Sequence, residues 1–219
     1  MLDSGYEIIK DFISQDQLYE IISEIEASAE FISESGIRNA EKKFNRVNLY
    51  LNSKEFFAAA KPYLDSSFAL VRAIIFNKTP TTNWFVTWHQ DKTIAVSERI
   101  SEIGWEPWSL KDGVHHVQPP ISILENMVTI RIHLDRANKE NGCLKVVPFS
   151  HKLGILKQDG IAEHTQNSEA VFCEVDKGDA LIMQPLLLHS SSKCIAPNNR
   201  RVLHLEYSNY LLPNGLKWC

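Results

Sequence analysis

Three residues in this sequence have the types and the spacing to bind one metal ion. His89 and Asp91 are separated by a single residue, so on an extended strand their side chains point to the same face. A third ligand must come from another segment, and His189 is the best candidate because it ends an apolar strand predicted at 185–189. Two histidines and one carboxylate on one face of a metal leave the opposite positions open, which is typical of non-haem iron(II) oxygenases.

A lone His-x-Asp pair is a weak signal, and an arginine further along the chain strengthens it. Arg200 follows His189 within one predicted hairpin, directly after a Pro-Asn-Asn turn at 197–199, so its guanidinium is expected near the third ligand. A guanidinium binds carboxylates in a bidentate manner, which suits the distal carboxylate of 2-oxoglutarate. Ser191 shares a strand face with His189 and is placed to assist. For the neighbouring Arg201 we expect a solvated position beside the turn.

With these residues, the sequence resembles the phytanoyl-CoA dioxygenase family of iron(II)- and 2-oxoglutarate-dependent oxygenases. The most distinctive segment is 141–151, Asn-Gly-Cys-Leu-Lys-Val-Val-Pro-Phe-Ser-His, and the segment 178–181, Gly-Asp-Ala-Leu, is similar too. The resemblance extends over roughly 76–207. It implies a double-stranded β-helix core (a jelly roll, cupin-like) with N-terminal helices packed outside.

The resemblance also implies roles for individual residues. The three candidate metal-binding residues match the iron ligands of the family, and Arg200, assisted by Ser191, matches the position that binds 2-oxoglutarate. The weaker co-substrate candidates are Lys78 and Thr129. The implied cofactors are Fe(II), 2-oxoglutarate and O2, and the implied reaction hydroxylates a small-molecule substrate with release of succinate and CO2. Because the substrates of the family differ widely, the resemblance does not identify the substrate.

The elements that must position these residues begin with helices. Ser14 and Gln17 have the form of a capping box, and apolar residues repeat behind them at three- and four-residue steps, which predicts an amphipathic helix. A second helix is expected to start at Asn52 or Ser53. Between the two helices, the stretch 38–46 is polar and basic and has no strong period.

From residue 68 onward the pattern changes to short segments rich in β-branched and aromatic residues, which predict strands. The predicted strands are 68–76, 83–89, 127–134, 144–147, 170–174, 180–183, 187–191 and 201–207. We therefore predict an α+β, mainly β protein with one domain over 1–219. Its helical layer is expected at about 1–66 and its jelly-roll core at about 67–212.

One long segment, 97–120, interrupts the predicted strands. Loops of this length inside a compact domain are typically binding loops or lids, so we expect a lid or a rim of a pocket here. Its Trp105, Trp108 and His116 are candidates for contacting the substrate, and Arg38 is a further candidate from the basic stretch.

The composition of the chain argues against nucleic acid and membranes as partners. The formal net charge is −4, so the basic surplus that nucleic-acid binding requires is missing. No apolar run approaches the roughly 20 residues of a membrane-spanning helix. The N-terminus lacks the basic start and apolar run of a signal peptide, and the four cysteines are isolated, which favours a cytoplasmic location.

Two alternative functions remain open from the sequence. A cupin-like metal enzyme without 2-oxoglutarate typically draws a further glutamate from just beyond its first His-x-His, whereas here Gln90 follows the first histidine and Glu98 is too far along the chain. A jelly-roll domain that binds without catalysing is the other alternative. Dependence of succinate release on an added substrate would distinguish the three functions.

Overall fold

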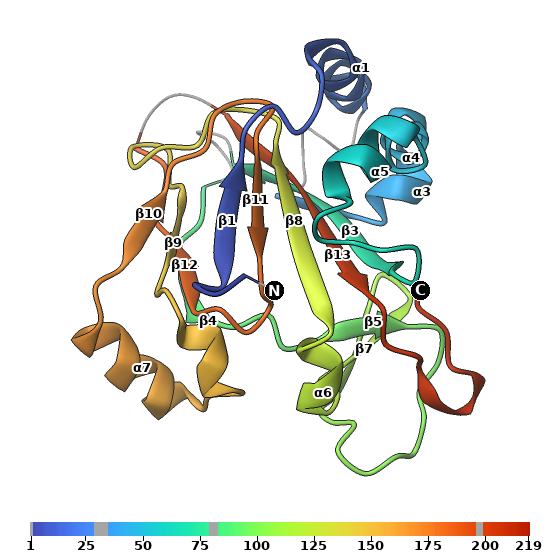
Figure 1. Cartoon of the computed structure of the whole chain (residues 1–219), viewed down its shortest axis with the longest axis vertical. Coiled ribbons are helices and arrows are strands. Elements are labelled where there is room, and N and C mark those ends of the chain that lie inside the picture. Colours follow the sequence, from blue (N-terminus) through green and yellow to red (C-terminus); the bar gives the residue numbers. More distant parts are fainter. Residues whose placement is uncertain (1, 29–34, 79–82, 196–198) are drawn as a thin grey trace.

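The computed structural model describes residues 2–28, 35–78, 83–195 and 199–219, and its centre is a large antiparallel sheet (Figure 1). This sheet has six strands in the order β1 (Tyr6–Ile9), β11 (Ala180–Met183), β8 (Met127–His133), β13 (Arg200–Ser208), β3 (Ala69–Lys78) and β2 (Gly36–Arg38). Two of its strands, β1 and β2, come from the N-terminal part of the chain, where the sequence pattern indicated helices only.

Two smaller antiparallel sheets complete the β structure. One has the order β10 (Val171–Cys173), β9 (Leu144–Val146), β12 (His189–Ser191) and β4 (Val86–His89). The other has the order β5 (Ile94–Val96), β7 (Val114–Val117) and β6 (Trp108–Lys111). The predicted α+β jelly-roll architecture is confirmed.

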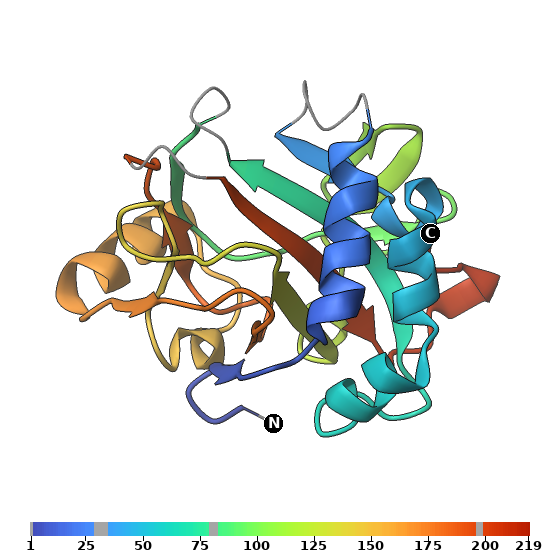
Figure 2. The same ribbon diagram turned by 90° about the horizontal axis from the view of Figure 1, so that it is seen from above.

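Helices form a layer on one face of the large sheet (Figures 1 and 2). They are α1 (Gln15–Glu26), α3 (Ala40–Lys43), α4 (Asn45–Leu51) and α5 (Lys54–Ala60). At the start of α1, the Ser14 hydroxyl accepts a hydrogen bond from the Gln17 backbone N–H, as the capping-box pattern predicts. Two further helices, α6 (Ile121–Leu124) and α7 (Gln158–Asn167), lie outside this layer. None of the helices in the described ranges combines the length and apolar character needed to cross a bilayer.

Alternation along the strands separates the apolar core from the polar interior. On β13, Leu203 and Leu205 join the apolar cluster beneath the helices, whereas His204 lines a cavity on the opposite face. The same rule divides β3, where Ile75 packs under the helices and Ile74 lines the cavity. The large sheet therefore has a dry face, which holds the helical layer, and a polar face, which holds the site.

The stretch 38–46, which shows no strong period in the sequence, contains α3 and the start of α4. Two expectations from the sequence need correction. The segment 97–120, expected to be a long loop, contains the paired strands β6 and β7. Arg201 is buried and not solvated, because it points to the helical side and forms ion pairs with Glu26 and Asp135. The predicted turn at 197–199 falls largely outside the described residues.

Candidate active site

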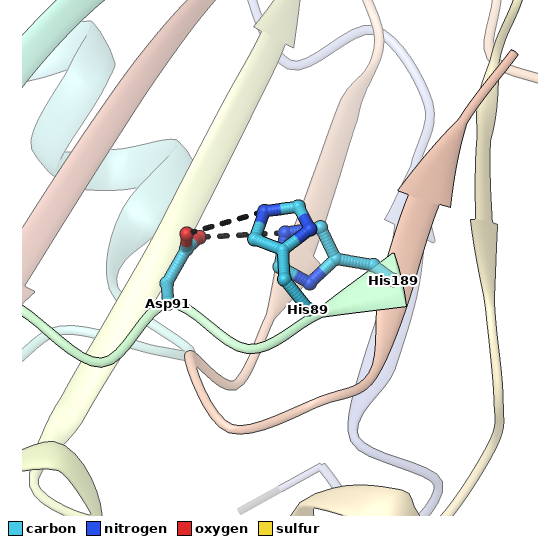
Figure 3. Close-up of side chains that lie close together, drawn as sticks. All are labelled: His89, Asp91 and His189. Atoms are coloured by element: carbon cyan, nitrogen blue, oxygen red, sulfur yellow. Dashed lines mark ion pairs between the residues drawn. The ribbon is translucent and has the colours of Figure 1, made fainter. Parts of the chain in front are cut away.

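The two candidate histidine ligands are brought together by strand pairing. His89 is the last residue of β4 and lies directly opposite His189, the first residue of β12, in the antiparallel register. Their ring centroids are 4.1 Å apart. Asp91 is not on the strand itself, as the sequence pattern suggested, but on the loop that follows β4, and its carboxylate turns back toward both rings (Figure 3).

Both imidazole rings are oriented with one nitrogen facing the carboxylate. The Nδ1 of His89 lies 2.9 Å from the carbonyl oxygen of Thr87, and the Nδ1 of His189 lies 2.8 Å from that of Leu187. A carbonyl only accepts, so each Nδ1 carries the proton and each Nε2 presents a lone pair. These Nε2 atoms lie 3.8 Å and 3.6 Å from the two Asp91 oxygens. The three side chains thus offer a ligand set that fits a divalent transition metal.

A neighbouring glutamine anchors the loop that carries the carboxylate. The Gln90 amide donates to the carbonyl oxygens of Gly154 and Leu186 at 2.7 and 2.8 Å, and its oxygen accepts from the Leu156 N–H at 2.8 Å. The Asp91 N–H donates to Pro185 at 2.9 Å. These bonds hold the loop in one conformation, so the metal would meet a preorganised carboxylate.

The pKa of Asp91 follows from its surroundings. Burial acts to raise it, but the electrostatic interactions with His189 and the other basic side chains around the carboxyl, Arg72 among them, outweigh burial and hold the pKa well below its ordinary value. Asp91 is therefore an anion at neutral pH, the form that binds a metal.

A cavity of about 320 Å³ extends from these three residues between the two larger sheets. At one end it is lined by Arg200 and Ser191, and β13 pairs with β3 so that Arg200 lies opposite Lys78. The Lys78 ammonium donates to the Ser191 hydroxyl at 2.8 Å and to the Ser192 carbonyl at 2.7 Å. Ser191 in turn donates to the Gly142 carbonyl at 2.8 Å, so its hydroxyl is committed to holding the lysine in place.

This end of the cavity and the adjoining wall hold more positive charge than the described residues neutralise. Among the described residues, no carboxylate forms an ion pair with Lys78, Arg131 or Arg200, and the Nε atoms of both arginines are buried without a hydrogen-bond partner. Burial and the Arg131 charge lower the pKa of Arg200 to about 10, and burial and the Arg200 charge lower the pKa of Lys78 to about 7. Such a group of buried cations fits a dianionic ligand, because a carboxylate would accept hydrogen bonds from the unpartnered donors and offset the repulsion between the cations.

Comparison with known proteins decides the family. A sequence profile described as phytanoyl-CoA dioxygenase (PhyH) matches residues 1–202. The chain belongs to the phytanoyl-CoA dioxygenase family. Its members are 2-oxoglutarate-dependent non-haem iron oxygenases that act on small molecules, as the resemblance implied.

The sequence identity between this member of the phytanoyl-CoA dioxygenase family and its individual relatives is low. A methylphosphonate hydroxylase of Gimesia maris is 30% identical over 100 residues, which cover 44% of this chain and 38% of that protein. The peroxisomal phytanoyl-CoA dioxygenase of Bos taurus is 28% identical over 90 residues, which cover 35% of this chain and 26% of that protein. The chain thus spans only 26% to 38% of the length of these curated relatives.

Solved structures show the same fold. AviO1 from Streptomyces viridochromogenes superposes with a TM-score of 0.70 at 20% identity, covering 96% of this chain and 92% of that one. This likeness supports the jelly-roll fold of the family.

A second acidic and histidine-containing group lies beside Asp91, and it is already saturated. His204 and Glu206, on β13, lie close enough to Asp91 to suggest a second metal site. However, Arg131 donates to the Nδ1 of His204 at 2.7 Å, and the Nε2–H of His204 donates to Glu206 at 2.9 Å. Glu206 also pairs with Arg72. Because both ring nitrogens are occupied, this family member uses the group as a rigid wall of the cavity.

Of the other predicted site residues, some line or adjoin the cavity and some lie elsewhere in the fold. Arg38 lines the cavity, whereas Trp105 is buried in a separate apolar cluster against which Trp108 packs. His116 is buried beside the cavity, with its Nδ1 3.5 Å from Arg72. Thr129 is buried on β8 outside the residues that line the cavity.

Sequence reasoning missed several residues that line or support the site. They are Arg72, Gln90, Lys111, Arg131, His204 and Glu206. One of them had a detectable signal, since Arg131 is a charged residue between Ile130 and Ile132 inside an apolar strand. Such a residue is buried on one face of a sheet and needs a partner there.

Proposed function

We propose that this chain is an Fe(II)- and 2-oxoglutarate-dependent dioxygenase that hydroxylates a small molecule with release of succinate and CO2. Iron would be held by His89, Asp91 and His189. The observation that carries the proposal is the pairing of this ligand set with the group of unneutralised buried cations at one end of the same cavity. When bound, the iron supplies the redox chemistry that couples decarboxylation of 2-oxoglutarate to oxidation of the substrate by O2.

The proposed roles of the chain's own residues are to bind the co-substrate, to orient it and to exclude water from the cavity. Arg200 binds the distal carboxylate of 2-oxoglutarate through its guanidinium, and Lys78, positioned by Ser191, adds a second donor. The hydrogen bonds that join Arg131, His204 and Glu206 fix the wall of the cavity. The assignment of Thr129 as a weaker co-substrate residue stays a prediction. The same holds for substrate contacts by Trp105, Trp108 and His116.

We further infer that residues 1–219 act as one oxygenase domain, with a helical layer at about 1–66 and a jelly-roll core at about 67–212. A single apolar cluster supports this, because it joins residues of α1 and α5 to residues of β8 and β13. A cytoplasmic location is also proposed, supported by the wide spacing of the four cysteines in the sequence.

Anaerobic ultraviolet–visible spectroscopy tests the proposed function. Iron(II) and then 2-oxoglutarate are added to the apo-protein, and a weak visible band from charge transfer between iron and the keto acid is expected. His89→Ala should lose both iron binding and the band. The matched control is His164→Ala on α7, which lies outside the cavity and should behave as the unaltered protein.

The other outcomes distinguish the alternatives. Stoichiometric iron binding without the band would favour a cupin-like metal enzyme that does not use 2-oxoglutarate. Absence of iron binding would favour a jelly-roll domain that binds without catalysing.

A further inference from the structure

A second group of cations lines the cavity at the end opposite Arg200. Arg38, Arg72 and Lys111 come from three different strands, β2, β3 and β6, and all line the cavity that contains the candidate metal ligands. Three strands that are far apart in the sequence therefore contribute positive charge to the same end of the cavity.

The strand register places the two cationic groups at opposite ends. Lys78 lies opposite Arg200, and Arg72 lies opposite Glu206 in the antiparallel pairing of β3 with β13. At about 3.4 Å per residue, the two ends are separated by about 20 Å along the strands. Arg38 of β2 lies opposite Ile74, near the Arg72 end. A single molecule of 2-oxoglutarate bound at Arg200 would leave this second group unused.

The second group is only partly neutralised by the protein. Arg72 is paired with Glu206, and Arg38 forms an ion pair with Asp112 at 3.0 Å. Lys111 has no acidic partner among the described residues, and burial together with the charges of Arg72 and Arg38 lowers its pKa. One ammonium without a partner and one arginine with an exposed, displaceable partner thus face the cavity.

We infer that the substrate of the proposed oxygenase is a small organic anion whose carboxylate or phosphonate group binds Lys111 and Arg38. The inference rests on the proposed function, since it assigns the Arg200 end to 2-oxoglutarate. The metal ligands line the same cavity, and Asp91 lies beside Glu206, the ion-pair partner of Arg72. An anion held at this end would therefore extend its carbon chain toward the metal ligands. The cavity volume of about 320 Å³ limits the substrate to a small molecule.

Calorimetric titration of the protein loaded with nickel(II) and 2-oxoglutarate tests this inference, since nickel replaces iron without turnover. The probes are propylphosphonate, butyrate and the neutral butyramide, which share a chain length and differ in charge. Both anions should bind about tenfold or more tightly than butyramide, because a charge-assisted hydrogen bond contributes more than a neutral one. The anion that binds more tightly identifies whether the charged group of the substrate is a phosphonate or a carboxylate.

Variants assign the binding to the residues. Lys111→Gln and Arg38→Gln should each weaken anion binding about tenfold and leave 2-oxoglutarate affinity unchanged. Asp112→Asn should strengthen anion binding, because it removes the carboxylate that competes for Arg38. The matched control is Arg46→Gln, since Arg46 also forms one ion pair at 3.1 Å but lies outside the cavity.

Equal binding of butyramide and the anions would overturn the inference, as would unchanged anion affinity in both Lys111→Gln and Arg38→Gln. Failure of 2-oxoglutarate itself to bind the nickel-loaded protein is a separate result, and it would overturn the proposed function. The first titration in each series, with 2-oxoglutarate alone, therefore distinguishes the two failures.

Discussion

Two adjacent arginines in this chain have opposite environments, because successive side chains on a strand point to opposite faces. Arg200 faces the cavity, where its Nε is buried without a partner among the residues that the structure describes. Arg201 faces the helical layer and forms ion pairs with Glu26 and Asp135. One residue is thus available to bind a ligand, and the other connects β13 to α1.

Replacing each arginine should separate ligand binding from stability. Arg200→Ala is expected to weaken 2-oxoglutarate binding about tenfold or more, because the co-substrate loses a charge-assisted bond. Arg201→Ala should leave this affinity unchanged and lower the free energy of unfolding by about 1–3 kcal/mol, since the partner carboxylates are partly exposed. Calorimetric titration with 2-oxoglutarate and urea denaturation measure the two effects. An unchanged 2-oxoglutarate affinity in Arg200→Ala would mean that the arginine is misassigned.

At the scale of the elements, the turn before β9 connects the distinctive 141–151 segment to the co-substrate end of the cavity. The Asn141 side chain accepts from the Asn138 N–H at 2.8 Å and donates to the Arg136 carbonyl at 2.7 Å, which closes the turn. Gly142 then has φ of 75°, and a Cβ at this position would lie 2.3 Å from the Ser192 carbonyl oxygen. Only glycine allows this close approach, which sets the position of β12 beside Lys78.

Gly142→Ala should therefore damage both the fold and the co-substrate site. The added methyl group must displace the Ser192 carbonyl, which accepts a hydrogen bond from Lys78, so weaker 2-oxoglutarate binding is expected together with a loss of stability of about 1–3 kcal/mol or more. Urea denaturation and 2-oxoglutarate titration check the two effects.

The matched control for this prediction is Gly113→Ala in the turn between β6 and β7. Gly113 has φ of 76°, but among the described residues nothing lies within 4 Å of the position that an added methyl group would occupy. Backbone strain alone should then cost about 1 kcal/mol and leave 2-oxoglutarate affinity intact. If the two variants behave alike, the close contact with Ser192 does not determine the site.

At the scale of the whole molecule, the polar interior makes stability depend on pH. Burial, reinforced by the Arg72 charge, lowers the pKa of His116 from 6.5 to about 4, and burial with the Arg131 charge lowers the pKa of His133 well below 6.5. The folded protein keeps both rings neutral, whereas the unfolded chain protonates them near pH 6.5. The unfolded state therefore binds more protons below this pH, so stability is complete above about pH 6.5 and falls as the pH decreases toward 4.

Urea denaturation of the metal-free protein should show this dependence as a lower midpoint at pH 5.0 than at pH 7.5. His116→Gln should reduce the difference between the two midpoints, because one of the proton-linked groups is removed. His164→Gln, on the partly exposed helix α7, should leave the difference unchanged. Equal midpoints at both pH values in the unaltered protein would contradict the prediction.

Local periodicity in the sequence was sufficient to predict several of the elements and the candidate metal ligands. Alternating or apolar segments indicated β3, β8, β11 and β13, and the Ser14 cap with its apolar stripe indicated α1. The candidate metal site followed from the one-residue spacing of His89 and Asp91 and from a histidine at the end of an apolar segment. The strands β6 and β7 escaped detection because most of their side chains are polar or exposed, so they show no alternation.

The set of charged side chains that share the cavity depends on how the strands pair in the folded protein. Strand register placed Arg200 opposite Lys78 and Arg72 opposite Glu206, and the pairing of β6 with β7 brought Lys111 to the same opening. Register depends on the packing of whole sheets and on the turns between them, and no local spacing encodes it. The chemistry of the site could therefore be predicted from short motifs, whereas the charge at its substrate end depends on contacts between segments far apart in the chain.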